Sequence, residues 1–312
     1  MIGTKHIFKI ASLALTMTTV GWAQSNTPNT VPYSHQYLKV HQYTAEQDAQ
    51  VLKLYDGLRV SDVIDALDAE NLHEVTMMDP HIRPLWRDNV HFTHRIHGIA
   101  MTVRLVPAQA IAPHFSNESD ALKWQGLDGG LTNGRWQLPA DIKADEGRAP
   151  NYSSLIHKGT VLVVDGEAKD NGMCGSNDGL AWTKLGLVGF VGEAVCRDTD
   201  ELTLTRIPVY QDPMKSPRGI NQGRMWVESY NQPVVVGGVL VMPGDVIVAD
   251  NDGVAVVPRA YAKQVADMAR DIFEDDEVKR GKIYDHLGRP RDWTVQGHTE
   301  PAPVPATPIL NQ

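Results

Sequence analysis

Cysteine is nearly absent from this chain of 312 residues, which contains Cys174 and Cys196 alone. A zinc site of the CxxC…CxxC kind needs four such ligands and is therefore excluded. An oxidising compartment would permit a disulfide between the two cysteines, but a core of this size does not require one. We therefore favour two buried, unpaired thiols and keep the disulfide as the alternative.

The chain also lacks several short motifs that carry common chemistries. It has no Walker loop, no dinucleotide-binding GxGxxG and no GxSxG elbow, which removes the commonest nucleotide-binding and serine-hydrolase hypotheses. Positive charge is scarce, with 29 Lys and Arg against 38 Asp and Glu and a net charge of −9. This balance disfavours nucleic acids and anionic membranes as partners.

No apolar run near the N-terminus reaches the ~20 residues that a membrane-spanning helix needs. The apolar stretch at residues 10–20 is shorter, follows Lys5 and Lys9, and is followed by small residues up to Ala23. This pattern predicts a secretory signal peptide at residues 1–23, with an uncleaved anchor as the alternative. We therefore expect a periplasmic or secreted protein that has no membrane contact after signal removal.

Composition divides the remainder of the chain. Polar turn formers predict a disordered lead-in at residues 24–43, and a loose Pro-rich tail is expected at 296–312. One domain is expected at residues 44–295, interrupted by an irregular insertion at about 107–154 of a length typical of a lid or binding loop. The insertion carries Trp124, Trp136 and Tyr152, which either form a stacking wall for a larger substrate or pack the insertion onto the domain.

Hydrophobic periodicity predicts a mixture of helices and strands. Helices are expected to start near residues 44, 61 and 258 and to span 176–185, and strands are expected at 98–106, 160–165, 187–191, 234–236, 239–242, 246–249 and 254–257. The first strand alternates large apolar residues with small or polar ones, which is typical of a half-buried strand. Tight turns in the C-terminal half favour antiparallel pairing.

Two polar patterns look like metal sites but favour other interpretations. His91, His94 and His97 recur every third residue beside a predicted strand, where an offset of three places neighbours on opposite faces. Structural or solvent-facing histidines are the favoured interpretation. The segment at residues 250–253 begins like a calcium loop but lacks the remaining ligands, so a hairpin turn is expected there.

Arg197 and Asp198 follow an apolar, strand-like run and carry the strongest chemical signal. A guanidinium can hold a substrate carboxylate through two parallel hydrogen bonds. An aspartate is a hard oxygen ligand suited to Mg²⁺ or Mn²⁺. Together they could bind a 2-oxo acid and polarise its carbonyl, whereas a solvated surface pair is the ordinary alternative for such a dipeptide.

A glycine turn precedes the helix predicted at residues 176–185. Free N–H groups at a helix start form an anion site, and Gly175 would let the backbone approach a carboxylate closely. The alternative is an ordinary helix cap made by Ser176, Asn177 or Asp178.

Several segments, in the right order, resemble the RraA-like proteins, a family that includes the metal-dependent 4-hydroxy-4-methyl-2-oxoglutarate aldolases. These segments are residues 60–67, 82–85, 98–103, 159–165, the Gly175 turn, 188–198, 233–239, 243–245 and 250–258. The resemblance implies an α/β fold of the layered α/β/β swivelling-domain type, here with a long irregular insertion. It also implies homotrimers or hexamers with active sites between subunits.

The resemblance further implies a divalent-metal-dependent lyase that acts on a small 2-oxo acid through a pyruvate enolate. Arg197 would hold the substrate carboxylate together with backbone amides of Gly175, Ser176 and Asn177, and Asp198 would hold Mg²⁺ or Mn²⁺. A non-catalytic ligand-binding or protein-binding module of the same family is the alternative.

The chain departs from the family pattern in three places. Ser176 stands where the aldolases have an Asp, and Asp178 is a possible replacement as a metal ligand. Ala194, preceded by Glu193, stands where glycine is usual. Near the C-terminus, where a neighbouring subunit normally supplies an acid, the chain has Lys282, for which Glu277 or Asp285 could substitute.

Overall fold

The computed structural model describes residues 38–73, 75–107, 116–117, 155–166, 172–215 and 225–295. The expected signal peptide, most of the lead-in, nearly all of the insertion with its three aromatic residues, and the Pro-rich tail lie outside these residues. All described elements belong to one compact unit, Leu38–Gln312. Within that unit, no described helix is both long enough and apolar enough to cross a membrane.

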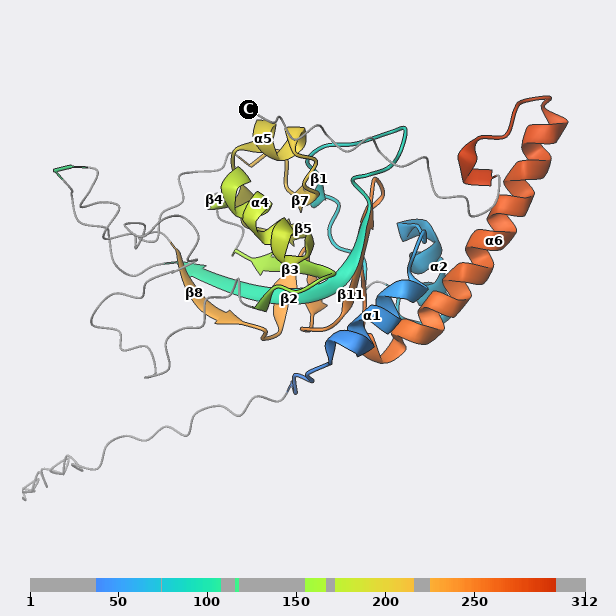
Figure 1. The fold of residues 1–312 in the computed structure, drawn as a ribbon. Coiled ribbons are helices and arrows are strands. Elements are labelled where there is room, and N and C mark those ends of the chain that lie inside the picture. Colours follow the sequence, from blue (N-terminus) through green and yellow to red (C-terminus); the bar gives the residue numbers. More distant parts are fainter. Residues whose placement is uncertain are drawn as a thin grey trace, which may run out of the picture. The chain divides into compact units, whose positions relative to one another are not determined.

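A sheet of eight strands forms the centre of the described unit (Figure 1). Its strands run in the order β1 (Arg83–Pro84), β7 (Val209–Gln211), β5 (Leu187–Gly192), β3 (Thr160–Asp165), β2 (Ile96–Pro107), β11 (Val246–Asp250) and β12 (Gly253–Val257), and β8 (Met225–Tyr230) pairs with the second half of β2. The central strands β2, β3, β5 and β7 run parallel to one another. Pairing is antiparallel at both ends of the sheet, between β1 and β7, between β2 and β11, and between β11 and β12.

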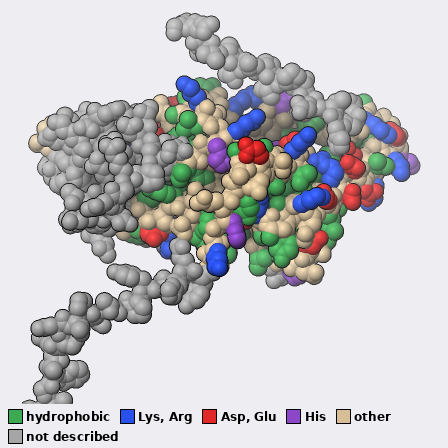
Figure 2. All heavy atoms as spheres, turned by 60° about the horizontal axis from the view of Figure 1, so that its bottom comes forward, with side chains coloured by type: hydrophobic (Ala, Val, Ile, Leu, Met, Phe, Trp, Pro, Cys, Tyr) green, Lys and Arg blue, Asp and Glu red, His purple; other side chains and the backbone are tan. Residues whose placement is uncertain are grey.

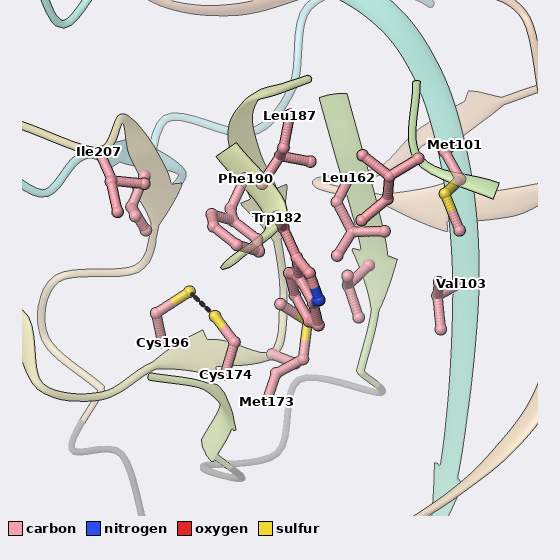
Figure 3. Close-up of a cluster of buried hydrophobic side chains, with 14 of the residues drawn as sticks. Met101, Val103, Leu162, Met173, Cys174, Trp182, Leu187, Phe190, Cys196 and Ile207 are labelled. Carbon is pink, nitrogen blue, oxygen red and sulfur yellow. Dashed lines mark hydrogen bonds between the residues drawn. The ribbon is translucent and has the colours of Figure 1, made fainter. Parts of the chain in front are cut away.

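Helices cover one face of this sheet. Over β3 and β5 lie α4 (Ser176–Leu185) and α5 (Thr199–Leu204), where Trp182 packs with Phe190 and Leu162 in a buried cluster (Figure 3). Over β11 and β12 lie α1 (Ala45–Leu54), α2 (Val60–Ala69) and α6 (Ala262–His286). Apolar burial against the sheet stabilises both groups of helices.

A small hairpin covers the opposite face. Its strands β9 (Val234–Val236) and β10 (Val239–Val241) pair in antiparallel fashion and pack buried valines against Val163 and Ile247. The result is a layer of helices, a main sheet and a second β layer, which confirms the α/β/β architecture expected from the sequence.

The strand β2 corrects one expectation. The sequence predicts a half-buried strand, but residues 98–103 are buried on both faces. Ile99 and Met101 point into the clusters under the helices, whereas Ala100 points into the cluster under the β9–β10 hairpin. Small residues such as Ala100, which suggested a solvent-facing side, instead leave room for the β9–β10 hairpin to pack on this face.

The start of α2 lies next to the predicted position. The helix, expected to start near residue 61, begins at Val60, and Ser61 lies inside it. Asp62 takes the capping role, because its Oδ2 accepts the N–H of Arg59 at 2.9 Å. The predicted turn at residues 250–253 is confirmed, because Asp250 and Gly253 face each other across the β11–β12 hairpin.

The three regularly spaced histidines occupy different environments. His94 is buried, and its Nδ1 accepts the N–H of Asp88 at 3.1 Å. His97 Nε2 lies 3.0 Å from Asp56 Oδ1. His91 remains half-buried. These separate surroundings agree with the structural roles favoured from their spacing.

Candidate functional site

Two short strands bring the glycine turn and the Arg–Asp pair together. β4 (Gly172–Cys174) and β6 (Val195–Cys196) form a two-stranded parallel sheet beside the main one. The N–H of Arg197 donates to the carbonyl of Cys174 at 2.9 Å. Segments 22 residues apart in sequence therefore place Gly175 next to Arg197.

Gly175 permits a close approach of the two segments. A Cβ atom at this position would clash with Asp198 Oδ2 and would lie 3.7 Å from Arg197 Cγ. The backbone of Gly175 is extended, with φ −131°, so it is space and not an unusual conformation that requires glycine here. The absence of a side chain at this one position therefore allows the two segments to meet.

Asp198 points its carboxylate at the start of α4. Its Oδ2 accepts the N–H of Ser176 at 3.0 Å and lies 3.4 Å from Ser176 Oγ, and its Oδ1 lies 3.6 Å from Arg197 Nε. The residue has left-handed backbone angles, φ 54° and ψ 46°, which Asp tolerates better than most residues. This backbone turn is what directs Asp198 back towards the helix.

Asp178 is a second carboxylate at the same helix start. Its Oδ2 accepts the N–H of Gly175 at 3.3 Å. Burial raises the pKa of Asp178 and the negative charge of Asp198 acts in the same direction, whereas the bond from Gly175 and the nearby Arg197 oppose the shift. Asp178 therefore holds a proton more readily than an ordinary aspartate does.

The helix start receives negative charge from the protein's own carboxylates, and Asp178 makes a capping contact of the kind given above as the alternative to an anion site. Of the three residues expected to offer amides to a substrate carboxylate, Gly175 and Ser176 donate theirs to Asp178 and Asp198. Asn177 is exposed. A substrate anion would therefore share or replace contacts that the protein's own carboxylates make here.

Arg197 has unused hydrogen-bonding capacity. Its side chain is 44% exposed, yet its Nε is buried and has no hydrogen-bond partner within the described part of the chain. A buried donor without a partner is costly, and a planar guanidinium suits a carboxylate in two-point contact. The geometry therefore fits the binding of a carboxylate at Arg197.

The carboxylates of the site also fit a divalent cation that takes part of its ligands from water and substrate. Asp198 Oδ1 makes no hydrogen bond to any described residue, and its side chain is 36% exposed. No three His, Cys, Asp or Glu residues in the described ranges gather into a metal-binding group. Mg²⁺ commonly uses one or two carboxylates and completes its shell with water and substrate oxygens, which suits Asp198 with Asp178 near it.

The acids suggested near the C-terminus lie on a different part of the unit. Glu277, Lys282 and Asp285 are on α6, which packs against α1 and α2, whereas α4 packs on β5 (Figure 1). Asp285 is already engaged, since its Oδ1 accepts from Arg291 Nε at 3.0 Å. A contribution from these residues to the site of another subunit remains a prediction.

The departures at residues 193 and 194 have structural partners. Ala194 carries a methyl group where the family usually has glycine. Gly166 faces it and leaves room for this methyl group, because a Cβ on Gly166 would clash with Ala194. Glu193 Oε1 accepts the N–H of Gly237 at 2.9 Å, and its Oε2 lies 3.5 Å from Lys215 Nζ. Glu193 therefore braces the turn before Arg197 against the β9–β10 hairpin.

One cavity lies away from these residues and was not foreseen from the sequence. It has a volume of about 530 Å³ and is lined by Asp48, His157, Thr160, Tyr230 and other residues near the first residue of β3. Asp48 is paired with Arg259 at 2.7 Å. Because the lining comes from segments far apart in the chain, no local motif announces it.

The structure is a layered α/β protein in which the start of α4, whose amides contact Asp178 and Asp198, lies beside an Arg–Asp pair. Residues 60–256 match the family model RraA-like, described as Aldolase/RraA. The chain belongs to this family.

Two curated relatives bear the provisional name 4-hydroxy-4-methyl-2-oxoglutarate aldolase. The protein of Halalkalibacterium halodurans is 29% identical over 130 residues, which are 41% of this chain and 60% of that protein. The protein of Alcanivorax borkumensis is 32% identical over 143 residues, which are 45% of this chain and 86% of that protein. Protein DlpA of Legionella pneumophila is 29% identical over 176 residues, 50% of this chain, and the match spans only 28% of its own length.

Solved structures show the same fold. Streptomyces coelicolor RraAS2, described as an unusual member of the RNase ES inhibitor RraA protein family, aligns with a TM-score of 0.55 and 20% identity over 78% of this chain and 99% of its own. A protein of Pseudomonas syringae pv. tomato aligns with a TM-score of 0.52 and 20% identity over 81% of this chain and 97% of its own. At this identity the similarity concerns the fold alone.

Proposed function

We propose that this protein is a divalent-metal-dependent carbon–carbon lyase that acts on a small 2-oxo acid, as an aldolase or a decarboxylase. The observation that carries the proposal is the buried Nε of Arg197, which has no hydrogen-bond partner among the described residues and lies beside the Asp198 carboxylate and the start of α4. The names of the relatives support the same reaction class.

Each residue of the site has a distinct task in this reaction. Arg197 binds and orients the substrate carboxylate, and the amides at the start of α4 add further donors. Asp198, with Asp178 acting through water, would hold Mg²⁺ or Mn²⁺, which when bound supplies Lewis-acid polarisation of the 2-oxo group. Bond cleavage would leave negative charge on the pyruvate enolate, which the Arg197 guanidinium is placed to stabilise.

The setting of the reaction is part of the proposal. We propose a periplasmic or secreted homotrimer or hexamer in which a neighbouring subunit completes the site. Of the acids on α6, Glu277 is better suited than Asp285 to complete that site, because Asp285 is paired with Arg291. On the face seen in Figure 2, basic and acidic side chains are interspersed, which supports a small-molecule partner over nucleic acid.

The test is pyruvate release from 4-hydroxy-4-methyl-2-oxoglutarate or oxaloacetate by the full chain with Mg²⁺. Arg197→Ala should lower kcat/KM by about 100-fold or more, because it removes the carboxylate clamp. Arg206→Ala is a matched control, since its side chain is 46% exposed and pairs with Asp88 at 3.4 Å. Equal rates for the wild type and Arg197→Ala would refute the role of Arg197.

A non-catalytic binding module is the second candidate, and Ser176 is the observation that favours it. The Ser176 hydroxyl is near Asp198 Oδ2, where the family's aldolases have a carboxylate. Calorimetry with oxalate and Mg²⁺, combined with the pyruvate assay above, separates the two functions. A binding module should bind oxalate but release no pyruvate from either substrate. Ser176→Asp sharpens the test: a lyase should gain Mg²⁺ affinity and turnover from the added carboxylate, and a binding module should gain no turnover.

A further inference from the structure

The two cysteines of the chain lie directly behind the candidate site. Cys174 is the last residue of β4 and Cys196 the last residue of β6, and they are partners in the register of that small sheet. Each immediately precedes a residue of the site, Gly175 and Arg197 respectively. Their side chains point towards each other (Figure 3), with the two Sγ atoms 2.6 Å apart.

The backbone suits a covalent bond between the two sulfurs. Neighbouring strands lie about 4.8 Å apart, which is within the range of about 4.4–6.8 Å that disulfides span between Cα atoms. The sulfurs are reduced in this structure. Because the strands are already paired at these two residues, the reduced and oxidised structures need to differ only by a small shift of the two side chains.

We propose that Cys174 and Cys196 form a redox-modification site, at which an intramolecular disulfide closes between the glycine turn and the Arg197–Asp198 segment. The oxidant is a small or protein disulfide. One cysteine thiolate attacks a sulfur of that disulfide and expels one thiolate from it. The second cysteine then attacks the mixed disulfide and expels the other thiolate. Two electrons pass from the cysteine sulfurs to the oxidant, and the two cysteine protons go to the released thiols.

The reaction requires a brief opening of the β4–β6 sheet. Both cysteines are no more than 1% exposed, and they pack with Met173 and Trp182 (Figure 3). Burial raises the pKa of Cys174, with Cys196 and the carboxylates of Asp178 and Asp198 adding to the shift, so the buried Cys174 thiol is a poor nucleophile. A sheet of three and two residues opens more readily than the eight-stranded sheet beside it.

The disulfide would join the two halves of the site covalently. In the reduced protein, the glycine turn and Arg197 are held together by few bonds, including the one from the Arg197 N–H to the Cys174 carbonyl. A crosslink at the residues just before them would hold the distance between the Gly175 turn and Arg197 fixed. This inference goes beyond the proposed lyase activity and does not depend on it.

Thiol counting on the purified full chain tests the proposal. The protein is equilibrated in glutathione buffers from fully reduced to fully oxidised, quenched in acid, unfolded and labelled with N-ethylmaleimide. Because the chain has two cysteines, the intact mass should correspond to two labels in reducing buffer and to none in oxidising buffer. The unlabelled protein should carry no bound glutathione. A non-reducing gel must show a monomeric chain. Two labels at every potential, or a crosslinked dimer, would overturn the proposal.

Stability and hydrogen exchange provide readouts that need no activity. Oxidation should raise the Tm by roughly 5–10 °C, because it closes a loop of 22 residues, and should slow amide exchange at Gly175, Ser176 and Arg197. Cys196→Ser and Cys196→Ala should each lose both responses while remaining folded in reducing buffer. A Tm that is the same in both buffers for the wild type would also overturn the proposal. An absence of pyruvate release from the wild type would count against the proposed lyase function but would leave the disulfide proposal unaffected.

Discussion

Aspartates have different surroundings in two regions of this protein. Around the β11–β12 hairpin, Asp250 accepts N–H groups at both oxygens, from Val60 at 3.0 Å and from Asp252 at 2.8 Å. Asp245 likewise accepts from Met242 at 2.8 Å and from Arg259 at 2.9 Å. Both are buried, at 4% and 3% exposure. Each oxygen of these two carboxylates therefore accepts a hydrogen bond within the fold.

At the candidate site the carboxylate of Asp198 is only half used. Its Oδ2 accepts from Ser176, but Oδ1 accepts no hydrogen bond from the described residues and lies 3.6 Å from Arg197 Nε. The comparison teaches that burial and charge alone do not mark a functional acid. An acid whose two oxygens both accept hydrogen bonds holds the structure. Asp198 instead keeps one oxygen that, among the described residues, is only in a loose ion pair with Arg197, and this oxygen remains available to a ligand.

The largest expected effect is on stability at Asp250. Asp250→Ala should lower the free energy of unfolding by about 4 kcal/mol, because it leaves the buried N–H of Val60 and the N–H of Asp252 without acceptors. Urea unfolding measures the loss. Asp252→Ala, an exposed neighbour in the same turn, should change the value by less than about 0.5 kcal/mol. Similar losses from both variants would contradict the role assigned to Asp250.

The pH dependence of stability should report Asp245. Burial raises the pKa of Asp245 to about 6, against opposing bonds from Met242 and Arg259 and the charge of Arg259. Between about pH 4 and 6 the folded state binds this proton and the unfolded state does not. Stability from this group is therefore greatest below about pH 4 and falls by roughly 3 kcal/mol as pH rises through 6.

Urea unfolding of the wild type and Asp245→Asn across pH 4–7 measures this contribution. Asparagine cannot titrate, so the difference between the two proteins should shift in favour of the variant as pH rises. A difference that stays constant over this range would show that Asp245 is ionised in the fold throughout.

Local chemistry explains which elements could be predicted from the sequence. The helix α4 and the strand β3 have the predicted bounds, because their ends are determined by nearby residues. Gly175 stands at the start of α4, and Gly186 ends it with a left-handed φ of 113°. In contrast, the burial of both faces of β2 depends on the β9–β10 hairpin, which is more than 120 residues away in the chain.

The site was predictable as a set of residues but not as a set of contacts. The dipeptide Arg197–Asp198 and the Gly175 turn follow from their residue types and the resemblance. The bond from Ser176 to Asp198 and the meeting of the two cysteines depend on the register of β4 with β6. Strands of three and two residues carry too little periodic signal to be predicted.

Gly175 offers a smaller test on the site side of the comparison. Gly175→Ala should cost about 2 kcal/mol of stability or less, because the new methyl group pushes the Asp198 carboxylate away and the exposed site can yield. Oxalate and Mn²⁺ binding, measured by calorimetry, should fall at least tenfold. Ser176→Ala, which keeps the amide that bonds to Asp198, is the control and should bind both ligands within about threefold of the wild type. Binding unchanged in Gly175→Ala would show that the position of Asp198 does not matter.

The smallest expected effect on stability is at Asp198. Asp198→Asn should change the free energy of unfolding by less than about 1 kcal/mol, because asparagine tolerates the left-handed backbone and can still accept from Ser176. Mn²⁺ affinity should nevertheless fall at least about tenfold, since a neutral amide replaces a charged ligand. Asp200→Asn, an exposed residue of the same helix α5, should leave both quantities unchanged. If Asp198→Asn cost as much stability as Asp250→Ala and left Mn²⁺ binding intact, the distinction between the two kinds of aspartate would fail.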